Sequence, residues 1–172
     1  PATVTHDIWK AVIKVNYGKN TVTVIAIDQA GNSNTATKDF LVYKRVIINL
    51  TIDNPVPTIN GEPQPPLEAA PFISGGRTMV PIRFISEAFD AKVDWEPVTK
   101  GITITLGDTV IAMQVGSTTV MVNGKSYTID APPVIKNGRT FVPIRFVSEI
   151  LGAKVDWDAN TRTVTITRDF IP

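Results

Sequence analysis

The apolar positions in the last third of the chain follow the period of an α-helix. Ile144, Val147 and Leu151 recur at i, i+3 and i+7, which gives an apolar stripe along one face. Pro143 suits the first helical position, because its missing N–H would be unpaired there in any case. Gly152 then offers the left-handed residue with which helices commonly end. The pattern predicts one short amphipathic helix.

The positions around this helix have the pattern of β-strands. Residues 110–115 form a mostly apolar run, which is typical of a strand buried on both faces. Residues 154–157 and 163–167 are strand-like and are joined by a turn-prone sequence. Asn123-Gly124 and Asn137-Gly138 each lie between β-prone runs, a strong local signal for a hairpin. Several antiparallel strands with one helix predict an α+β plan.

This pattern is present twice in the chain. The sequence from Gly138 to Thr167 matches that from Gly76 to Thr105 without a gap, and an upstream match continues it after one extra residue between Gly61 and Pro71. The first copy has Asp90 in place of Gly152 as the residue that ends the helix. Self-similarity of this kind indicates one supersecondary unit used twice.

The sequence therefore predicts two repeats, at residues 45–107 and 108–172. A single repeat is so short that its core would be marginal. We therefore expect the two repeats to pack together or to pair strands across their junction.

Residues 1–44 have a different composition, rich in Thr, Val and Asn, with no helical pattern. Three strand-like runs are predicted, at Ala11–Val15, Thr21–Ile27 and Thr35–Tyr43, with turns between them. Three or four strands are too few to close a sandwich. A single layer leaves one face in water, so we expect an unsatisfied sheet edge or face that pairs with the first repeat, with upstream sequence or with strands of a neighbouring chain.

Charge and composition exclude several classes of function. The net charge of the 172 residues is +1 and there is no run of five basic residues, which argues against a nucleic-acid partner. Cysteine is absent and His6 is the only histidine, which excludes disulfides, thiolate catalysis and sites with two imidazoles. The apolar runs are far below the ~18 residues of a membrane span, so we expect no membrane insertion. The chain begins with Pro1 and not Met, so we expect it to be a fragment of a longer protein. The lack of a signal peptide in it therefore says nothing about where the protein is located.

The repeated sequence resembles a known family. VNGKSYTIDAPPVIKN followed by GRTFVPIRFVSEILGAKVDWDANTRTVTIT is similar to the copper amine oxidase N-terminal domain, and the resemblance covers most of residues 45–170. In amine oxidases this domain is a stalk, remote from the copper, in which a five-stranded antiparallel sheet is twisted around one helix. Similar domains occur in secreted and surface proteins without an oxidase. GKNTVTVIAIDQAGNSNTATKDFLVY, within residues 1–44, resembles the last strands of a bacterial immunoglobulin-like domain.

The resemblance implies a fold and a location. The expected fold class is α+β, with two repeats of an antiparallel sheet wrapped around one helix after a small all-β immunoglobulin-like segment. The expected location is extracellular, at the cell surface.

The family name raises the question of a metal or cofactor. The oxidase cofactor arises from a tyrosine in an Asn-Tyr-Asp/Glu motif beside three histidines, whereas Asn16-Tyr17-Gly18 is the only Asn-Tyr pair here. Asp156, Asp158 and Asn160 alternate like the start of a calcium loop, but the glycine and glutamate that such a loop needs are replaced by threonines. A turn is the favoured interpretation. We expect no cofactor, no metal and no catalytic residue.

Four residues remain as candidates for a ligand or partner surface. Arg83 and Arg145 occupy equivalent positions, each four residues before a glutamate; an intrahelical ion pair worth a few tenths of a kcal/mol is favoured over a recognition site. Trp9 and Tyr17 lie outside the repeats and are candidate surface aromatics.

The two tryptophans of the repeats, Trp95 and Trp157, would be either sugar-stacking platforms or core residues. Each shares one strand face with an apolar residue two positions before it, which favours packing beneath the helix.

The function expected from these observations is a non-catalytic accessory or structural module of a secreted or surface-anchored bacterial protein, acting as a stalk, spacer or assembly region. The alternative is a carbohydrate- or cell-wall-binding module of a secreted enzyme. The expected partners are cell-wall polysaccharide or neighbouring chains that pair strands with residues 1–44.

Overall fold

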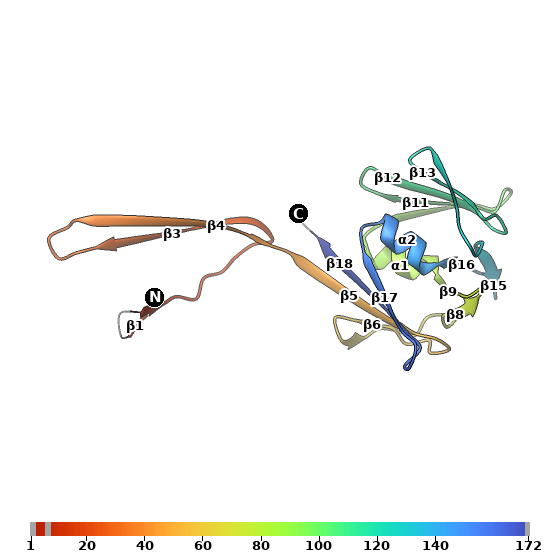
Figure 1. Ribbon diagram of the computed structural model, residues 1–172, viewed down its shortest axis with the longest axis horizontal. Coiled ribbons are helices and arrows are strands. Elements are labelled where there is room, and N and C mark those ends of the chain that lie inside the picture. The colour runs from red at the N-terminus through yellow and green to blue at the C-terminus, as the bar shows by residue number, and fades with distance from the viewer. Residues whose placement is uncertain (1–2, 6–7, 171–172) are drawn as a thin grey trace. The chain divides into compact units, whose positions relative to one another are not determined.

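The computed structural model describes residues 3–5 and 8–170 (Figure 1). The chain forms two compact units. The first comprises residues 1–45 together with 169–172, and the second comprises Val46–Arg168. Both repeats lie in the second unit, apart from their outermost residues.

The first unit contains two separate two-stranded antiparallel sheets. Strand β1 (Thr3–Thr5) pairs with β2 (Ile8–Lys10), and the ten-residue strands β3 (Gly18–Ile27) and β4 (Ser33–Val42) form a long hairpin. The two longer predicted strands are therefore confirmed. The predicted strand at Ala11–Val15 is wrong, because this segment is exposed irregular chain. No neighbouring strand accepts its backbone hydrogen bonds within the part of the chain that the structure describes, and β-propensity alone does not hold a strand.

The tip of the β3–β4 hairpin is closed by the carboxylate of Asp28. Its Oδ1 accepts hydrogen bonds from the backbone N–H groups of Ala30 (2.9 Å) and Asn32 (2.8 Å), and its Oδ2 accepts one from the Asn32 amide (2.8 Å). The hydrogen bonds from Asn32 and the turn backbone lower the pKa of Asp28 below its ordinary value. The predicted turn is confirmed.

In the second unit the two repeats contain the same elements in the same order. The first has β5 (Lys44–Thr51), β6 (Thr58–Ile59), β7 (Glu62–Pro63), β8 (Phe72–Ser74), β9 (Arg77–Pro81), α1 (Ile82–Ala88), β10 (Lys92–Glu96) and β11 (Gly101–Leu106). The second has β12 (Thr109–Gln114), β13 (Thr119–Val122), β14 (Lys125–Thr128), β15 (Val134–Lys136), β16 (Arg139–Pro143), α2 (Ile144–Ile150), β17 (Lys154–Asp158) and β18 (Thr163–Phe170). The secondary structure is β-rich with two helices, which is the α+β class expected.

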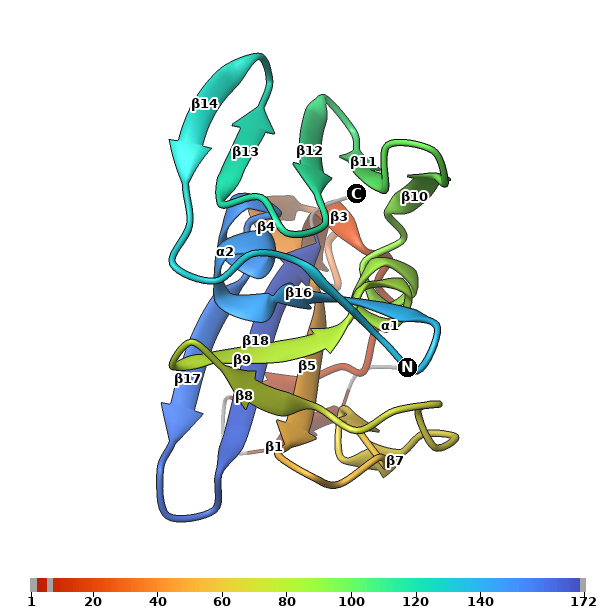
Figure 2. The same cartoon turned by 90° about the vertical axis from the view of Figure 1, so that its right-hand side faces the viewer.

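The sheets do not coincide with the repeats, because each sheet contains strands from both. One five-stranded sheet has the order β10-β11-β12-β13-β14 and the other has the order β17-β18-β5-β6-β7. Each therefore combines the last two strands of one repeat with the first three of the other. The third sheet, β15-β16-β9-β8, takes two strands from each repeat, and both helices lie between the five-stranded sheets (Figures 1 and 2). The expectation that the repeats pair strands across their junction is confirmed.

The segments in which the two repeats are most alike, residues 77–87 and 139–149, lie at the centre of this strand exchange. Strands β9 and β16 are antiparallel partners, with Val80 opposite Val142 and Met79 opposite Pro143. Met79, Val80, Val142 and Phe141 have no exposed surface. The Phe141 ring contacts that of Phe72 edge-on, with centroids 4.9 Å apart. The arrangement approximates a two-fold axis between Val80 and Val142, so the most similar part of the two repeats forms the core that they share.

The two helices end as the sequence predicts and begin one residue later than predicted. Pro143 lies just outside α2, with φ −67° and ψ 110°, as the residue that precedes the first helical turn. The stripe predicted from the apolar period, including Ile144 and Val147, is buried. After the helices the backbone turns left-handed at Asp90 (φ 56°) and Gly152 (φ 81°), which confirms both predicted stops.

The Asn-Gly pairs form the tight turns predicted for them. Asn123-Gly124 and Asn137-Gly138 have positive φ at both positions and join β13 to β14 and β15 to β16. The first repeat has Asn60-Gly61 at the first of these places. The Asn60 and Asn123 side chains accept hydrogen bonds from the backbone N–H groups of Ile47 in β5 (2.8 Å) and Val110 in β12 (2.7 Å), respectively.

The equivalent serines of the helices differ in their hydrogen bonding, which leads to a prediction. The Ser86 hydroxyl donates to the Ile82 carbonyl (2.9 Å), whereas the buried Ser148 hydroxyl has no partner among the described residues. Ser148→Ala should therefore leave the free energy of unfolding unchanged or raise it by up to about 1 kcal/mol, since a buried hydroxyl without a partner is costly. Ser86→Ala should lower the same free energy by about 0.5–1.5 kcal/mol. Urea unfolding of both variants is the measurement, and equal losses would contradict it.

Neither helix, within the described residues, has the length and hydropathy of a membrane-spanning segment.

Candidate functional site

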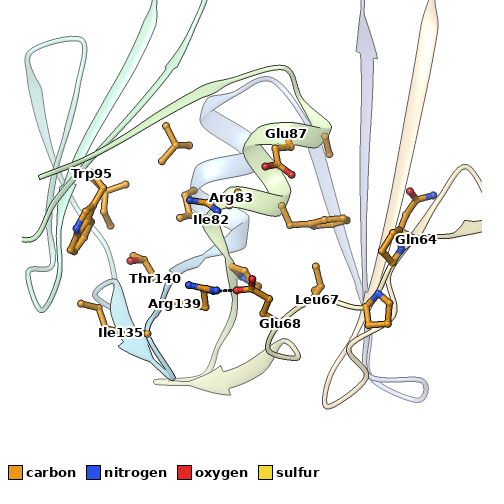
Figure 3. A pocket seen from close by; sticks show the side chains of 18 of the residues that line it. Gln64, Leu67, Glu68, Ile82, Arg83, Glu87, Trp95, Ile135, Arg139 and Thr140 are labelled. Atoms are coloured by element: carbon orange, nitrogen blue, oxygen red, sulfur yellow. Dashed lines mark ion pairs between the residues drawn. The ribbon is translucent and has the colours of Figure 1, made fainter. Parts of the chain in front are cut away.

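A groove with a volume of about 710 Å³ lies within the second unit (Figure 3). Its wall is built by four segments: the loop at residues 64–68, helix α1, the paired strands β10 and β11, and the β15–β16 hairpin. The volume falls within the ~300–1,000 Å³ of typical ligand pockets. Because the hairpin belongs to the second repeat and the other segments to the first, this "first-repeat groove" exists only in the exchanged arrangement.

The indole of Trp95 forms one side of the groove, opposite Gln64 and Leu67 (Figure 3). Trp95 is 42% exposed and Trp157 is 39% exposed, so the prediction that both pack beneath a helix is wrong. A helix of seven residues is only about 10 Å long. It covers the earlier part of the neighbouring strand, where Val155 is buried, and leaves the tryptophan two residues further on half in solvent.

The polar side chains of the groove come from both repeats. Arg139 of the second repeat forms an ion pair with Glu68 of the first (Figure 3). Arg77 and Asp130 form the reciprocal pair at the equivalent place. All four residues are exposed, so each pair adds little stability, but the two pairs are related by the pseudo-two-fold axis.

The two helix arginines behave differently. Arg145 forms the predicted i, i+4 ion pair with Glu149, with 3.5 Å between nitrogen and oxygen, and also donates to the Val155 carbonyl (3.2 Å). Arg83 and Glu87 form neither contact; of the residues that the structure describes, none bonds to either side chain. Both line the first-repeat groove, and Arg83 projects from α1 on the side of Trp95 (Figure 3).

The equivalent place in the second repeat carries an aromatic ring that is partly exposed. Tyr127 corresponds to Gln64 and its ring contacts Phe146 edge-on, with centroids 6.3 Å apart. Strand β14 extends through Tyr127 and Thr128, which pair with β13, whereas β7 ends at Pro63. The first repeat has prolines at 63, 65 and 66, and proline has no N–H for a sheet ladder. The Gln64 and Leu67 N–H groups still donate to the Pro57 (2.9 Å) and Pro55 (2.8 Å) carbonyls. What differs at the groove is therefore the Gln64 side chain, which stands where the second repeat has the tyrosine ring.

The remaining candidates lie elsewhere. Tyr17 is exposed and precedes β3 in the first unit. Trp9 lies in β2, but its side chain is outside the described residues. Trp9 and Tyr17 thus belong to the first unit, whereas Arg83 and Arg145 belong to the second.

Of the residues considered for calcium, Asp158 and Asn160 form a turn, whereas Asp156 lies within β17. Asp158 Oδ1 accepts a hydrogen bond from the Asn160 N–H (2.8 Å), which, with those from Thr161, lowers the pKa of Asp158. Asp156 pairs with Lys154 at 2.8 Å. Across the described ranges, no group of three or more His, Cys, Asp or Glu side chains could hold a metal ion. The hydrogen bonds that Asp158 accepts from Asn160 and Thr161 confirm the predicted turn.

The family model described as copper amine oxidase N-terminal domain matches residues 2–89 and 58–166. The two overlapping segments are consistent with tandem copies. The chain belongs to the copper amine oxidase N-terminal domain family, as its sequence motif predicted.

Two relatives illustrate the contexts in which such sequences occur. A protein named protease inhibitor from Brevibacillus choshinensis is 34% identical over 98 residues, which is 56% of this chain and 30% of that protein. A primary amine oxidase from Klebsiella aerogenes is 28% identical over 78 residues, which is 45% of this chain and 10% of the oxidase. The chain thus spans less than a third of either relative.

Proposed function

We propose that this chain is a non-catalytic accessory module, acting as a stalk, spacer or assembly region of a longer bacterial protein that is secreted or anchored at the cell surface. The family it belongs to is the non-catalytic N-terminal domain of copper amine oxidases. One observation carries the proposal: the segments in which the repeats are most alike, residues 77–87 and 139–149, form the buried β9–β16 pair and the helices that follow it. What the chain repeats is therefore a folding unit, in which each five-stranded sheet would wrap around a helix as in the family's stalk.

The ends of the second unit support attachment from one side. Thr51 contacts Thr163 (2.9 Å) and Asn49 contacts Thr165 (2.8 Å), so β5 and β18 are antiparallel neighbours. Val46 and Arg168, where the unit begins and ends, then lie on adjacent strands. A module whose two ends lie next to each other adds little length to the protein that contains it. This favours an assembly or presentation role over a linear spacer.

The experiment is deletion of residues 46–168 from the complete protein in its own host. We expect the turnover of any catalytic part to be unchanged per molecule, while the distribution between wall, medium and assembled forms changes. Cell fractionation with an antibody against the chain measures the location. Cytoplasmic protein in intact cells, or amine oxidation by the purified chain, would overturn the proposal.

We further propose that residues 1–44 are part of an immunoglobulin-like domain that accepts strands from a neighbouring chain. The β3–β4 ladder has no third strand within the described residues, and Ile25 and Ile27 of β3 are exposed. Strand addition at an open edge is a common mode of association. Light scattering should show self-association that Ile25→Lys with Ile27→Lys abolishes. A monomeric parent chain at all concentrations would contradict it.

A second candidate function is binding of carbohydrate or cell wall. The half-exposed Trp95 within a groove that also contains polar side chains favours it. Retention of the chain on insoluble cell wall or polysaccharide, saturable and lost on replacing an exposed tryptophan, is the test.

A further inference from the structure

We propose that the first-repeat groove binds a neutral oligosaccharide segment, with Trp95 as the surface on which a sugar ring stacks. The inference rests on the second candidate function and deepens it, because it assigns the site to one repeat and the ligand to the uncharged class.

The difference between the two repeats indicates where the ligand binds. The pseudo-two-fold axis gives two equivalent places, and in the second one the Tyr127 ring lies against Phe146. In the first, Gln64 stands in the place of the tyrosine and lines the groove. If both places served only the core, the same aromatic packing would suit both. The first repeat instead lacks this packing, and its half-exposed Trp95 lines the open groove.

The indole is placed to hold a sugar ring. It lies on one wall of the groove, with Gln64 and Leu67 facing it from the other (Figure 3). One face of a pyranose ring carries aliphatic C–H groups with a partial positive charge. Such a face suits the negative π-face of an indole, while the hydroxyls at the ring edge stay free to hydrogen-bond.

The polar groups beside Trp95 suit hydroxyls better than a charged ligand. Arg83 and Glu87 line the groove without a partner among the residues described, and they offer donors and acceptors in planar arrays that match neighbouring hydroxyls. Their charges cancel, as do those of the Arg139–Glu68 ion pair. A groove with balanced charge exerts no net attraction on an ionic polymer.

A peptide that adds as a β-strand fits less well. The free edge beside Trp95 is that of β10, whose other face carries Lys92, Asp94 and Glu96, with Lys92 paired to Asp94 at 2.9 Å. Charged side chains along an edge strand are a typical protection against strand addition. The observations therefore favour a sugar.

The test uses the complete 172-residue chain and four proteins: the parent, Trp95→Ala, Trp157→Ala and Gln64→Tyr. Trp157 is the matched control, because it occupies the equivalent position and is exposed to the same degree. Gln64→Tyr places in the groove the type of residue that the second repeat has at the equivalent position, Tyr127. Circular dichroism melts first establish that all four proteins are folded. Binding is then measured by affinity electrophoresis in soluble α- and β-glucans, mannan and an anionic polyuronate, and by pulldown on insoluble cell wall.

We expect the parent chain to bind at least one neutral polysaccharide, with little dependence on salt. Trp95→Ala and Gln64→Tyr should weaken this binding about tenfold or more, and Trp157→Ala should leave it unchanged. Binding that survives Trp95→Ala would overturn the groove as the site but leave carbohydrate binding in place. Retention on the polyuronate alone would overturn the neutral class. No retention on any polysaccharide or cell wall, or capture of a peptide through Trp95 without any sugar, would overturn the inference together with the second candidate function.

Discussion

Phe141→Ala is expected to lower the free energy of unfolding by about 3–5 kcal/mol, the range for removal of a fully buried phenylalanine. The Phe141 ring has no exposed surface and lies in a cluster with Met79 and Phe72, where strands of the two repeats meet. The surrounding backbone is the β9–β16 pair itself, which cannot collapse into the cavity without breaking the sheet. Urea unfolding followed by circular dichroism gives the value.

Trp157→Ala is the control for this prediction. The tryptophan is larger than phenylalanine, but 39% of its surface is exposed, so its removal leaves no closed cavity and should cost less than about 2 kcal/mol. If the tryptophan variant were the less stable of the two, the indole would have to pack beneath the helix in solution.

Ending the chain after Leu106 is expected to abolish the folded monomer of the second unit. This truncation removes β17–β18 from the sheet that contains β5, removes β12–β14 from the sheet that contains β11, and removes β16 from beside β9. The remaining strands would expose their edges and the core residues of every sheet. Size-exclusion chromatography with light scattering and circular dichroism should find either unfolded chains or a two-fold dimer in which two copies restore the exchange.

A permuted chain provides the matched control. In the sequence, Gly107-Asp108 joins β11 to β12, and the ends of the unit at Arg168 and Val46 occupy the equivalent place between β18 and β5. A chain that runs from Thr109 to Arg168, continues through a Gly-Asp turn and ends with residues 46–106 should fold as a monomer. A folded monomer from the truncated chain, or an unfolded permuted chain, would contradict the exchanged topology.

The helices and turns could be predicted because their signals are local. The positive φ that a helix end or a tight turn requires is supplied by the residue at that position, as at Gly152 and at Asn123-Gly124. The apolar period of α2 likewise lies within a few residues. Membership of the family could also be predicted, because the motif that identifies it is continuous in the sequence.

Features that depend on distant partners were predicted less well. A β-propensity such as that of Ala11–Val15 forms a strand only where a neighbour accepts its hydrogen bonds. Alternation placed Trp95 and Trp157 on the apolar face of their strands, but could not show that a seven-residue helix is too short to cover them. The different behaviour of Arg83 and Arg145 likewise depends on residues outside the helix: Arg145 donates to the Val155 carbonyl, whereas Arg83 lines the groove.

The sequence by itself determined that one β-rich unit with one helix is present twice and to which family it belongs, because duplication and local backbone chemistry are written in consecutive residues. It also contained the difference between the two repeats at the groove, where Gln64 takes the place of Tyr127. Only the tertiary structure decided which repeat each strand pairs with. Two similar repeats offer each strand equivalent partners in its own copy and in the other. The two-residue connection between β11 and β12 is too short for anything but a hairpin across the junction, so it fixes that one pairing. The pairings of β9 with β16 and of β5 with β18 join segments far apart in the sequence and are seen only in the tertiary structure.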